Sequence, residues 1–130
     1  MQQFKIGKRV IGIDKDPLIV SEIGINHNGS LDLAIKIADS AIDAGAEIIK
    51  HQTHVVDDEM ANVSKKIIPG NSNKSIYEII KKCSLSEMNE KKLMQHIKSR
   101  GRIFFSTPFS RKAVERLEKF NVPIYKIGSG

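Results

Sequence analysis

Residues 18–53 read LIVSEIGINHNGSLDLAIKIADSAIDAGAEIIKHQT, and this stretch predicts a strand, a helix and a second strand. Leu18–Ile25 is largely apolar and rich in β-branched residues, as buried strands are. Ser30 is a candidate N-cap, apolar residues recur after it at helical spacing, and Gly45 is a candidate helix stop. Glu47–Thr53 is the second strand. Two strands joined by a helix in this way are expected to lie parallel.

The same alternation continues along the rest of the chain. Residues 55–75 form a long connection that contains Pro69-Gly70-Asn71, and a connection of that length usually marks a functional loop. The remaining predicted elements are a hairpin of Phe4–Ile6 and Arg9–Ile13, a helix over Ile76–Cys83, a helix from the capping box Ser84-x-x-Glu87 to about Ser99, a strand over Arg102–Thr107, a helix capped by Ser110, and a strand over Ile124–Ile127.

This order predicts an α/β fold, the N-terminal half of a (β/α)₈ TIM barrel preceded by a β-hairpin over residues 4–13. A four-stranded open sheet also fits the order, but no strand is followed by a Gly-rich dinucleotide loop. Polar residues stand at the carboxyl ends of all four strands, where barrel enzymes build their active sites. We therefore assign residues 1–130 to the N-terminal part of one barrel domain.

The composition excludes several classes of function. The 130 residues include 21 Lys and Arg against 15 Asp and Glu, a net charge of +6 that suits an anionic substrate. The basic residues are spread along the chain without an Arg-rich run, so a nucleic-acid partner ranks last among the possibilities. The chain shows no apolar run of membrane-spanning length and no secretory signal. Its single cysteine suits a reducing compartment, so we expect a cytoplasmic protein with no membrane partner.

The polar residues at the strand ends are the candidate site. Side chains alternate between the faces of a strand, so residues two apart share a face. Glu has a poor strand propensity and a buried carboxylate needs partners, which makes Glu22 hard to explain as structural. Two ammonium groups among hydroxyls suit a small, multiply charged anion. The set at the four strand ends is Glu22, Lys50, Gln52, Thr107, Lys126 and Ser129.

Each candidate also has a structural explanation. Lys50 and Lys126 could extend outward to solvent, although two such lysines at equivalent strand ends favour a site. Thr107 suits a strand by propensity alone. Ser129 lies between two glycines, and Asn71 follows Pro-Gly, and both patterns are typical of turns.

The histidines do not predict a metal site. His51 and His54 are three residues apart, so on a strand they would point to opposite faces. His27 lies in a predicted loop and could hydrogen-bond locally. Cys83 has no neighbour in sequence that would activate it, and we interpret it as an inert helix residue.

Seven short segments carry a resemblance to a known family. They are EIGINHNG (22–29), KHQTH (50–54), DDEM (57–60), IPGN (68–71), SIYE (75–78), STPFSR (106–111) and YKIGSG (125–130). In this order and spacing they resemble the bacterial sialic acid synthases, the N-acetylneuraminate synthases with their legionaminate and pseudaminate relatives. The resemblance runs from Phe4 to Gly130.

The resemblance implies an activity. These synthases condense phosphoenolpyruvate with a 2-acetamido sugar such as N-acetylmannosamine, and they release phosphate with C–O cleavage. They use a divalent metal, Mn or Mg, and form homodimers. Their fold is a (β/α)₈ barrel followed by a small antifreeze-like domain.

The family's site residues carry over to matching positions. The resemblance implies that Lys50, Thr107, Lys126 and Ser129 bind phosphoenolpyruvate, with Lys126 also catalytic. It implies that Glu22 and Gln52 lie near the acceptor sugar and the reacting carbons, with Glu22 catalytic, and that Asn71 contacts the acceptor from the long connection. The Asn71 assignment rests on the resemblance alone.

The resemblance further implies that the metal ligands, the other barrel strands and the antifreeze-like domain lie outside these residues. We therefore expect an N-terminal fragment without synthase activity of its own. The alternatives are a non-catalytic half barrel that serves as a binding or assembly module, and a Schiff-base aldolase with Lys126 as nucleophile. The acceptor sugar could also be a legionaminate or pseudaminate precursor.

Overall fold

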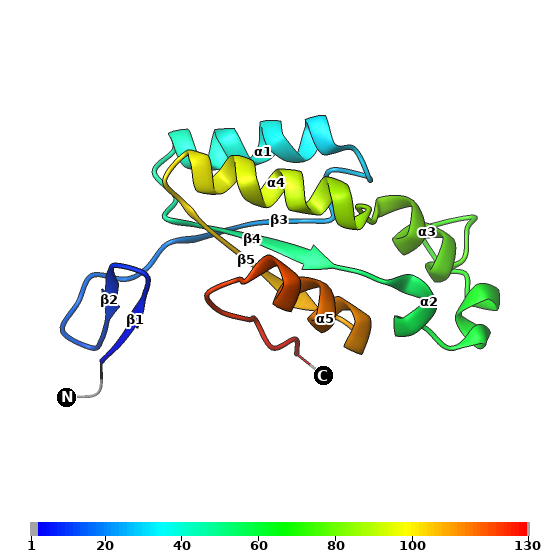
Figure 1. Ribbon diagram of the computed structural model, residues 1–130. Helices are drawn as coiled ribbons and strands as arrows, with labels where there is room; N and C mark the ends of the chain where they lie inside the picture. The colour runs from blue at the N-terminus through cyan, green and yellow to red at the C-terminus, as the bar shows by residue number, and fades with distance from the viewer. Residues whose placement is uncertain (1–2, 130) are drawn as a thin grey trace.

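A parallel sheet in the order β3-β4-β5 lies at the centre of the computed structural model, which describes residues 3–129 (Figure 1). The strands are β3 (Val20–Gly24), β4 (Ile48–Thr53) and β5 (Ile103–Pro108). Helix α1 (Leu31–Asp43) connects β3 to β4, helices α3 (Ile76–Cys83) and α4 (Glu87–Ser99) lie between β4 and β5, and α5 (Arg111–Phe120) follows β5. The predicted α/β class with parallel strands is confirmed.

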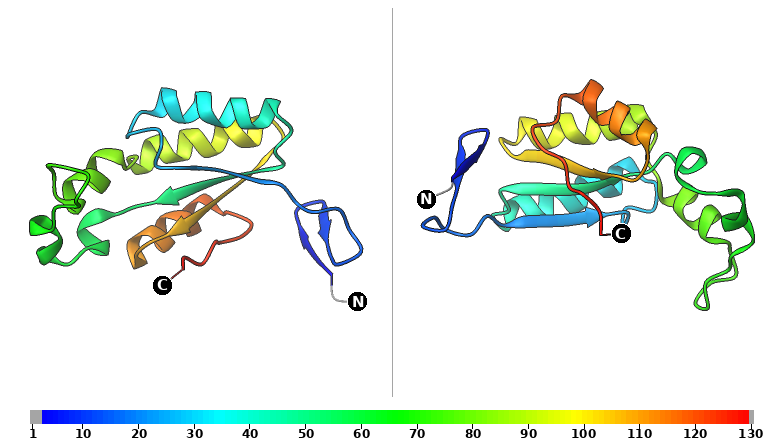
Figure 2. Two further views of the ribbon diagram at one scale, coloured as in Figure 1. Left: turned by 180° about the vertical axis from the view of Figure 1, so that it is seen from behind. Right: turned by 90° about the horizontal axis from the view of Figure 1, so that it is seen from below.

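The two ends of the sheet carry different segments. Strands β1 (Phe4–Ile6) and β2 (Arg9–Ile11) pair antiparallel with each other, beyond the amino ends of the sheet strands (Figure 2). At the carboxyl ends, the predicted connection 55–75 contains helix α2 (Val56–Glu59) and the 3₁₀ helix η1 (Asn62–Lys66). The connection therefore lies at the end of the sheet where the candidate residues were predicted.

Serine side chains begin four of the helices, and one predicted cap was wrong. Ser30 and Ser110 cap α1 and α5 as predicted. The capping box belongs to α3, where Ser75 and Glu78 satisfy each other's backbone N–H groups. Ser84 ends α3 instead of beginning α4, because its hydroxyl donates back to the last turn of that helix. Ser86, two residues later, caps α4.

The predicted strand over Ile124–Ile127 was also wrong. The segment makes one isolated bridge between Tyr125 and Ser106 of β5, with the backbone N–H of Lys126 donating to the Ser106 carbonyl at 3.2 Å. A ladder needs consecutive pairs, and Pro123 brings no N–H to the start of the segment. The backbone around Lys126 thus lies alongside β5 without forming a strand.

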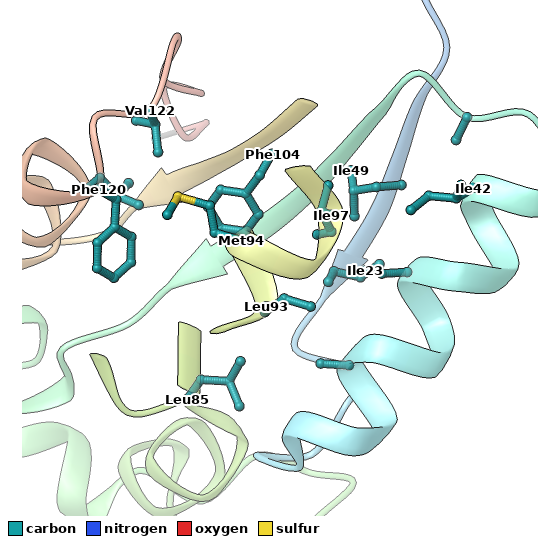
Figure 3. Close-up of a cluster of buried hydrophobic side chains, with 14 residues drawn as sticks. Ile23, Ile42, Ile49, Leu85, Leu93, Met94, Ile97, Phe104, Phe120 and Val122 are labelled. Atoms are coloured by element: carbon teal, nitrogen blue, oxygen red, sulfur yellow. The ribbon is translucent and has the colours of Figure 1, made fainter. Parts of the chain in front are cut away.

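Apolar side chains on the two faces of the sheet form separate clusters. Ile48 and Phe105 point to one face, where Ile6 of β1 packs on them. Helices cover the other face of the sheet, and each helix buries its apolar side there. The apolar core lies between these helices and the sheet (Figure 3). Among residues 3–129 no helix has the length and apolar sequence needed to cross a bilayer. The helix-side cluster comprises Ile23, Ala34, Ala38, Ile42, Ala46, Ile49, Leu85, Leu93, Met94, Ile97, Phe104, Leu117, Phe120 and Val122.

The loop after β3 is held against the last turn of α3, and a glycine substitution tests this contact. A Cβ at Gly29 (φ +79°) would overlap the backbone oxygen of Lys82, whereas a Cβ at Gly45 (φ +97°) would meet open space. We expect Gly45→Ala to lower the free energy of unfolding by about 1–2 kcal/mol through backbone strain alone. Gly29→Ala carries the strain and the clash, so we expect a loss of about 2–5 kcal/mol. Urea denaturation of both variants measures the difference, and equal losses would contradict the close approach.

Candidate functional site

Three of the predicted residues lie together on the sheet face opposite the helices, called the front face below. In the parallel register Glu22 of β3 lies beside Lys50 of β4. The Lys50 Nζ is 2.9 Å from the Glu22 Oε2, and the Gln52 Nε2 donates to the Glu22 Oε1 at 3.2 Å. Lys50 and Gln52 share this face because they are two residues apart on one strand. The carboxylate is thus held between an ammonium group and an amide.

Glu22 is ionised in this arrangement. The hydrogen bond from Lys50 lowers the pKa of Glu22; burial opposes the shift, and Gln52 and the positive charges of Lys50 and Lys126 add to it. The net direction is below the ordinary carboxyl value. A carboxylate of this kind can orient a polar group or face a developing positive charge, and it is poorly suited to donate a proton near neutral pH.

Thr107 and Lys126 extend the same cluster across the sheet. Thr107 lies beside Gln52 in the β4–β5 register, and its side chain is buried. Lys126 lies beside β5, because its backbone N–H donates to the Ser106 carbonyl. Its Nζ donates to the carbonyl of Ile127. The positive charges of Lys50 and Lys126 both lower the pKa of the Glu22 carboxyl. Cations beside a buried hydroxyl are what an anionic ligand requires.

Asn71 and Ser129 are not joined to this cluster. Both are exposed, Asn71 in the long connection and Ser129 beyond Lys126. Within residues 3–129 no hydrogen bond or ion pair connects either of them to Glu22 or Lys50. Their assignment therefore stays a prediction based on the resemblance.

His54 is a neighbour of the site that sequence reasoning missed. Its Nδ1 is 2.8 Å from the Glu59 Oε2, and its Nε2 is 3.2 Å from the Gln52 Oε1. The ring stacks on Phe109 with centroids 4.4 Å apart. His51 and His54 lie on opposite sides of the sheet as predicted, because His51 contacts Glu90 of α4 and His54 contacts Gln52 on the front face. The acidic residue five positions later was the one signal in the sequence that could have indicated a partner.

The described residues do not fit a metal site. Within residues 3–129 no group of three His, Cys, Asp or Glu side chains could hold a metal ion. The histidine nitrogens that could ligate one are already engaged: His27 with His51, His51 with Glu90, and His54 with Glu59.

A cavity of about 280 Å³ lies at the amino ends of the strands, away from the candidate cluster. It is lined by Gly7, Lys8, Arg9, Glu47, Gly101, Arg102 and Ile103, and none of the predicted site residues is among them. The candidate site is therefore defined by the polar contacts on the front face and not by this cavity.

Known proteins are similar to this chain in sequence and fold. Residues 17–130 match the NeuB family. The chain is 36% identical over 130 residues to the uncharacterized protein MJ1065 of Methanocaldococcus jannaschii, covering 100% of this chain and 36% of that protein. It is 33% identical over 120 residues to the N,N'-diacetyllegionaminic acid synthase of Campylobacter jejuni, covering 89% of this chain and 36% of the synthase.

A solved structure gives the same result for the fold. The N-acetylneuraminic acid (sialic acid) synthetase of Leptospira borgpetersenii superposes with a TM-score of 0.81 at 28% identity, covering 97% of this chain and 41% of that one. The chain thus spans little more than a third of the length of the first curated relatives it matches, at 36% of each. Its fold resembles the N-terminal part of that synthetase.

The buried His27 imidazole predicts a loss of stability in acid. Burial and then the neighbouring His51 lower the pKa of His27 from 6.5 to about 4. The unfolded chain binds a proton below pH 6.5 while the folded chain does not, so stability falls as the pH drops from 6.5 towards 4. The slope from this group is at most about 1.4 kcal/mol per pH unit.

Urea denaturation between pH 6.5 and 4.5 measures this slope, because the carboxyl groups with lowered pKa values contribute mainly below that range. We expect His27→Gln to flatten it. An unchanged slope in His27→Gln would contradict the assignment.

Proposed function

The chain belongs to the NeuB family, and we propose that it is the N-terminal part of a sialic acid synthase that acts on phosphoenolpyruvate and N-acetylmannosamine. The observation that supports this most is the ionised Glu22 held by Lys50 and Gln52 at the carboxyl ends of parallel strands. That end of an α/β barrel is where substrates bind. The products are a nonulosonic acid and phosphate.

The proposal includes the half barrel. The sheet order follows the chain order, the helices cover one face, and the segment around Tyr125 continues the sheet beyond β5. We propose that further strands complete a (β/α)₈ barrel around the front face, so that the apolar cluster of Ile48 and Phe105 becomes part of the barrel interior. The β1–β2 pair would then cover the barrel at its amino end.

Each front-face residue has a part in binding. We propose that Lys50 and Lys126 bind the phosphate and carboxylate of phosphoenolpyruvate, with the Thr107 and Ser129 hydroxyls donating to the same groups. Neutralising these charges lets the enol carbon approach the sugar aldehyde. In the proposal Gln52, and Asn71 from the long connection, face the acceptor.

The proposed reaction forms one carbon–carbon bond and breaks one carbon–oxygen bond. The double bond of phosphoenolpyruvate attacks the aldehyde carbon, whose oxygen takes up a proton, and positive character develops at the enol carbon. The ionised Glu22 lies in the cluster where it can stabilise that charge. Water then adds to the same carbon and loses a proton. The tetrahedral intermediate collapses and expels phosphate.

Other parts of the proposal rest on the resemblance. They are a divalent metal, Mn or Mg, with ligands outside the described residues, a homodimer, and a cytoplasmic location. The proposed acceptor is N-acetylmannosamine, and the acceptors of legionaminate or pseudaminate synthases are the alternatives.

Removing the charge of Lys50 tests the site. In the protein as produced from its gene, we expect Lys50→Met to lower phosphate release from phosphoenolpyruvate and N-acetylmannosamine by about 10²–10³-fold, because one preorganised donor to the anion is lost. Lys98→Met, an exposed lysine of α4, is the matched control and should leave the rate unchanged. Steady-state phosphate release measures both. Equal rates in the two variants would exclude Lys50 from the site.

Borohydride trapping with pyruvate separates the synthase from the aldolase alternative. We expect no adduct, and a pyruvate adduct on Lys126 would instead favour a Schiff-base aldolase.

Residues 1–130 alone should be inactive. In the proposal further strands are needed to complete the barrel around the front face, and no group of side chains in the described part could hold a metal. We expect no phosphate release above a no-protein control when this polypeptide is given both substrates. Release at a rate proportional to protein concentration would overturn this expectation.

A further inference from the structure

A buried polar network lies on the back face of the sheet, behind the candidate site. The side chains of His27, His51 and Glu90 are 0%, 1% and 0% exposed. His27 comes from the loop after β3, His51 from β4 and Glu90 from α4. The two rings stack with their centroids 5.3 Å apart. Charged and polar groups buried to this extent are costly unless every one is paired.

The contacts allow a single arrangement of protons along the histidines. The backbone N–H of Gly29 donates to the His27 Nδ1 at 3.1 Å, so that nitrogen carries no proton. The proton of His27 is therefore on Nε2, which lies 3.2 Å from the His51 Nε2. His51 must accept there, which leaves its own proton on Nδ1, 2.9 Å from the Glu90 Oε1. The reverse arrangement would require a His27 ring with no proton at all.

Glu90 completes the chain as an ionised acceptor. Its Oε1 also accepts the Thr53 hydroxyl, and its Oε2 accepts the Arg116 Nη1 of α5 at 2.9 Å. Burial by itself would raise the pKa of Glu90, but the donors His51, Thr53 and Arg116 outweigh it and the net shift is downward. Every partner of the Glu90 carboxylate is a donor. The network therefore forms only when this carboxylate is ionised.

The network and the front face alternate along the same strands. On β4, His51 lies between Lys50 and Gln52, and Thr53 follows. On β5, the Ser106 hydroxyl is 2.7 Å from the Thr53 hydroxyl and immediately precedes Thr107. The Ser106 carbonyl accepts the backbone N–H of Lys126. On β4 and β5, each front-face site residue is thus next to a residue of the network.

We propose that His27, His51 and Glu90 are positioning residues that fix the loop after β3, strand β4 and helix α4 relative to one another and, through the Thr53–Ser106 contact, strand β5. They thereby set the spacing of Glu22, Lys50 and Thr107. The inference rests on the proposed function for its kinetic part only. A misplacement of about 1 Å in reacting groups can cost about 10²-fold in rate. A hydrogen-bonded chain with one proton arrangement holds three segments in one register.

Nitrogen NMR of histidine-labelled protein tests the proton arrangement. The protein as produced from its gene is used, and the His27 and His51 resonances are assigned with His→Gln variants. We expect opposite tautomers, His27 protonated on Nε2 and His51 protonated on Nδ1 at neutral pH. The same tautomer in both rings, or an imidazolium in either, would overturn the proposal.

A glutamine at position 90 tests the positioning itself. Glu90→Gln keeps the shape, but its NH₂ group meets only donors, so the proton arrangement is broken. We expect the side-chain amide resonance of Gln52 to shift and kcat to fall at least tenfold, at a temperature where circular dichroism shows the variant folded. Glu115→Gln, at an exposed position of α5, is the control and should change neither. A folded Glu90→Gln protein with wild-type kcat and an unmoved Gln52 resonance would refute the positioning role.

The two proposals fail in different ways. If wild-type protein forms no phosphate from the two substrates, the proposed function fails, while the tautomers and the response of Gln52 still decide the positioning role. If wild-type protein is active and the histidines share one tautomer, the positioning proposal fails and the proposed function stands.

Discussion

The buried carboxylate of Glu90 accepts hydrogen bonds from His51 and Thr53 of β4 and from Arg116 of α5, while its own backbone belongs to α4. Leaving such a charge without one of its donors costs about 3–5 kcal/mol, which is a large part of the stability of a domain. Strand β4 and helices α4 and α5 must therefore take the one relative placement in which every hydrogen bond to the Glu90 carboxylate forms. Through His27 the same constraint reaches the loop that follows β3. The apolar core between sheet and helices packs in the arrangement that these contacts permit.

Much of the fold follows from local sequence periodicity. The helix over Ile76–Cys83 was predicted with its observed bounds, and the sheet strands within one or two residues at most ends, because burial repeats every two or every 3.6 residues in the two kinds of element. The segment Ile124–Ile127 has the composition of a strand and forms one bridge only, since strand formation depends on pairing that composition does not determine. Glu90 likewise differs little in local sequence from the exposed Glu87. Its burial depends on Arg116, 26 residues away.

The candidate site was predictable to the extent that it lies within strands. Alternation placed Lys50 and Gln52 on one face of their strand, and the expected parallel order placed Glu22 at a neighbouring strand end. The structure brings the three into contact. His51 and His54 were assigned to opposite faces by the same rule, and His51 contacts Glu90 on the helix side while His54 contacts Gln52 on the front face. Asn71 lies in a connection whose path no periodicity describes. Alternation also explains why the back-face network went unnoticed, since its members read as strand and helix residues until the elements are packed together.

The pairing of Lys50 with Glu22 has a consequence for the proposed reaction. In the protein alone the ammonium group and the carboxylate neutralise each other at 2.9 Å. A multiply charged phosphate attracts Lys50 more strongly than a single carboxylate does, so substrate binding would draw the ammonium group away. Gln52 still donates to the Glu22 carboxylate at 3.2 Å and keeps it oriented. The carboxylate would then be least neutralised when positive charge develops on the enol carbon, which is when its stabilising effect on the transition state is greatest.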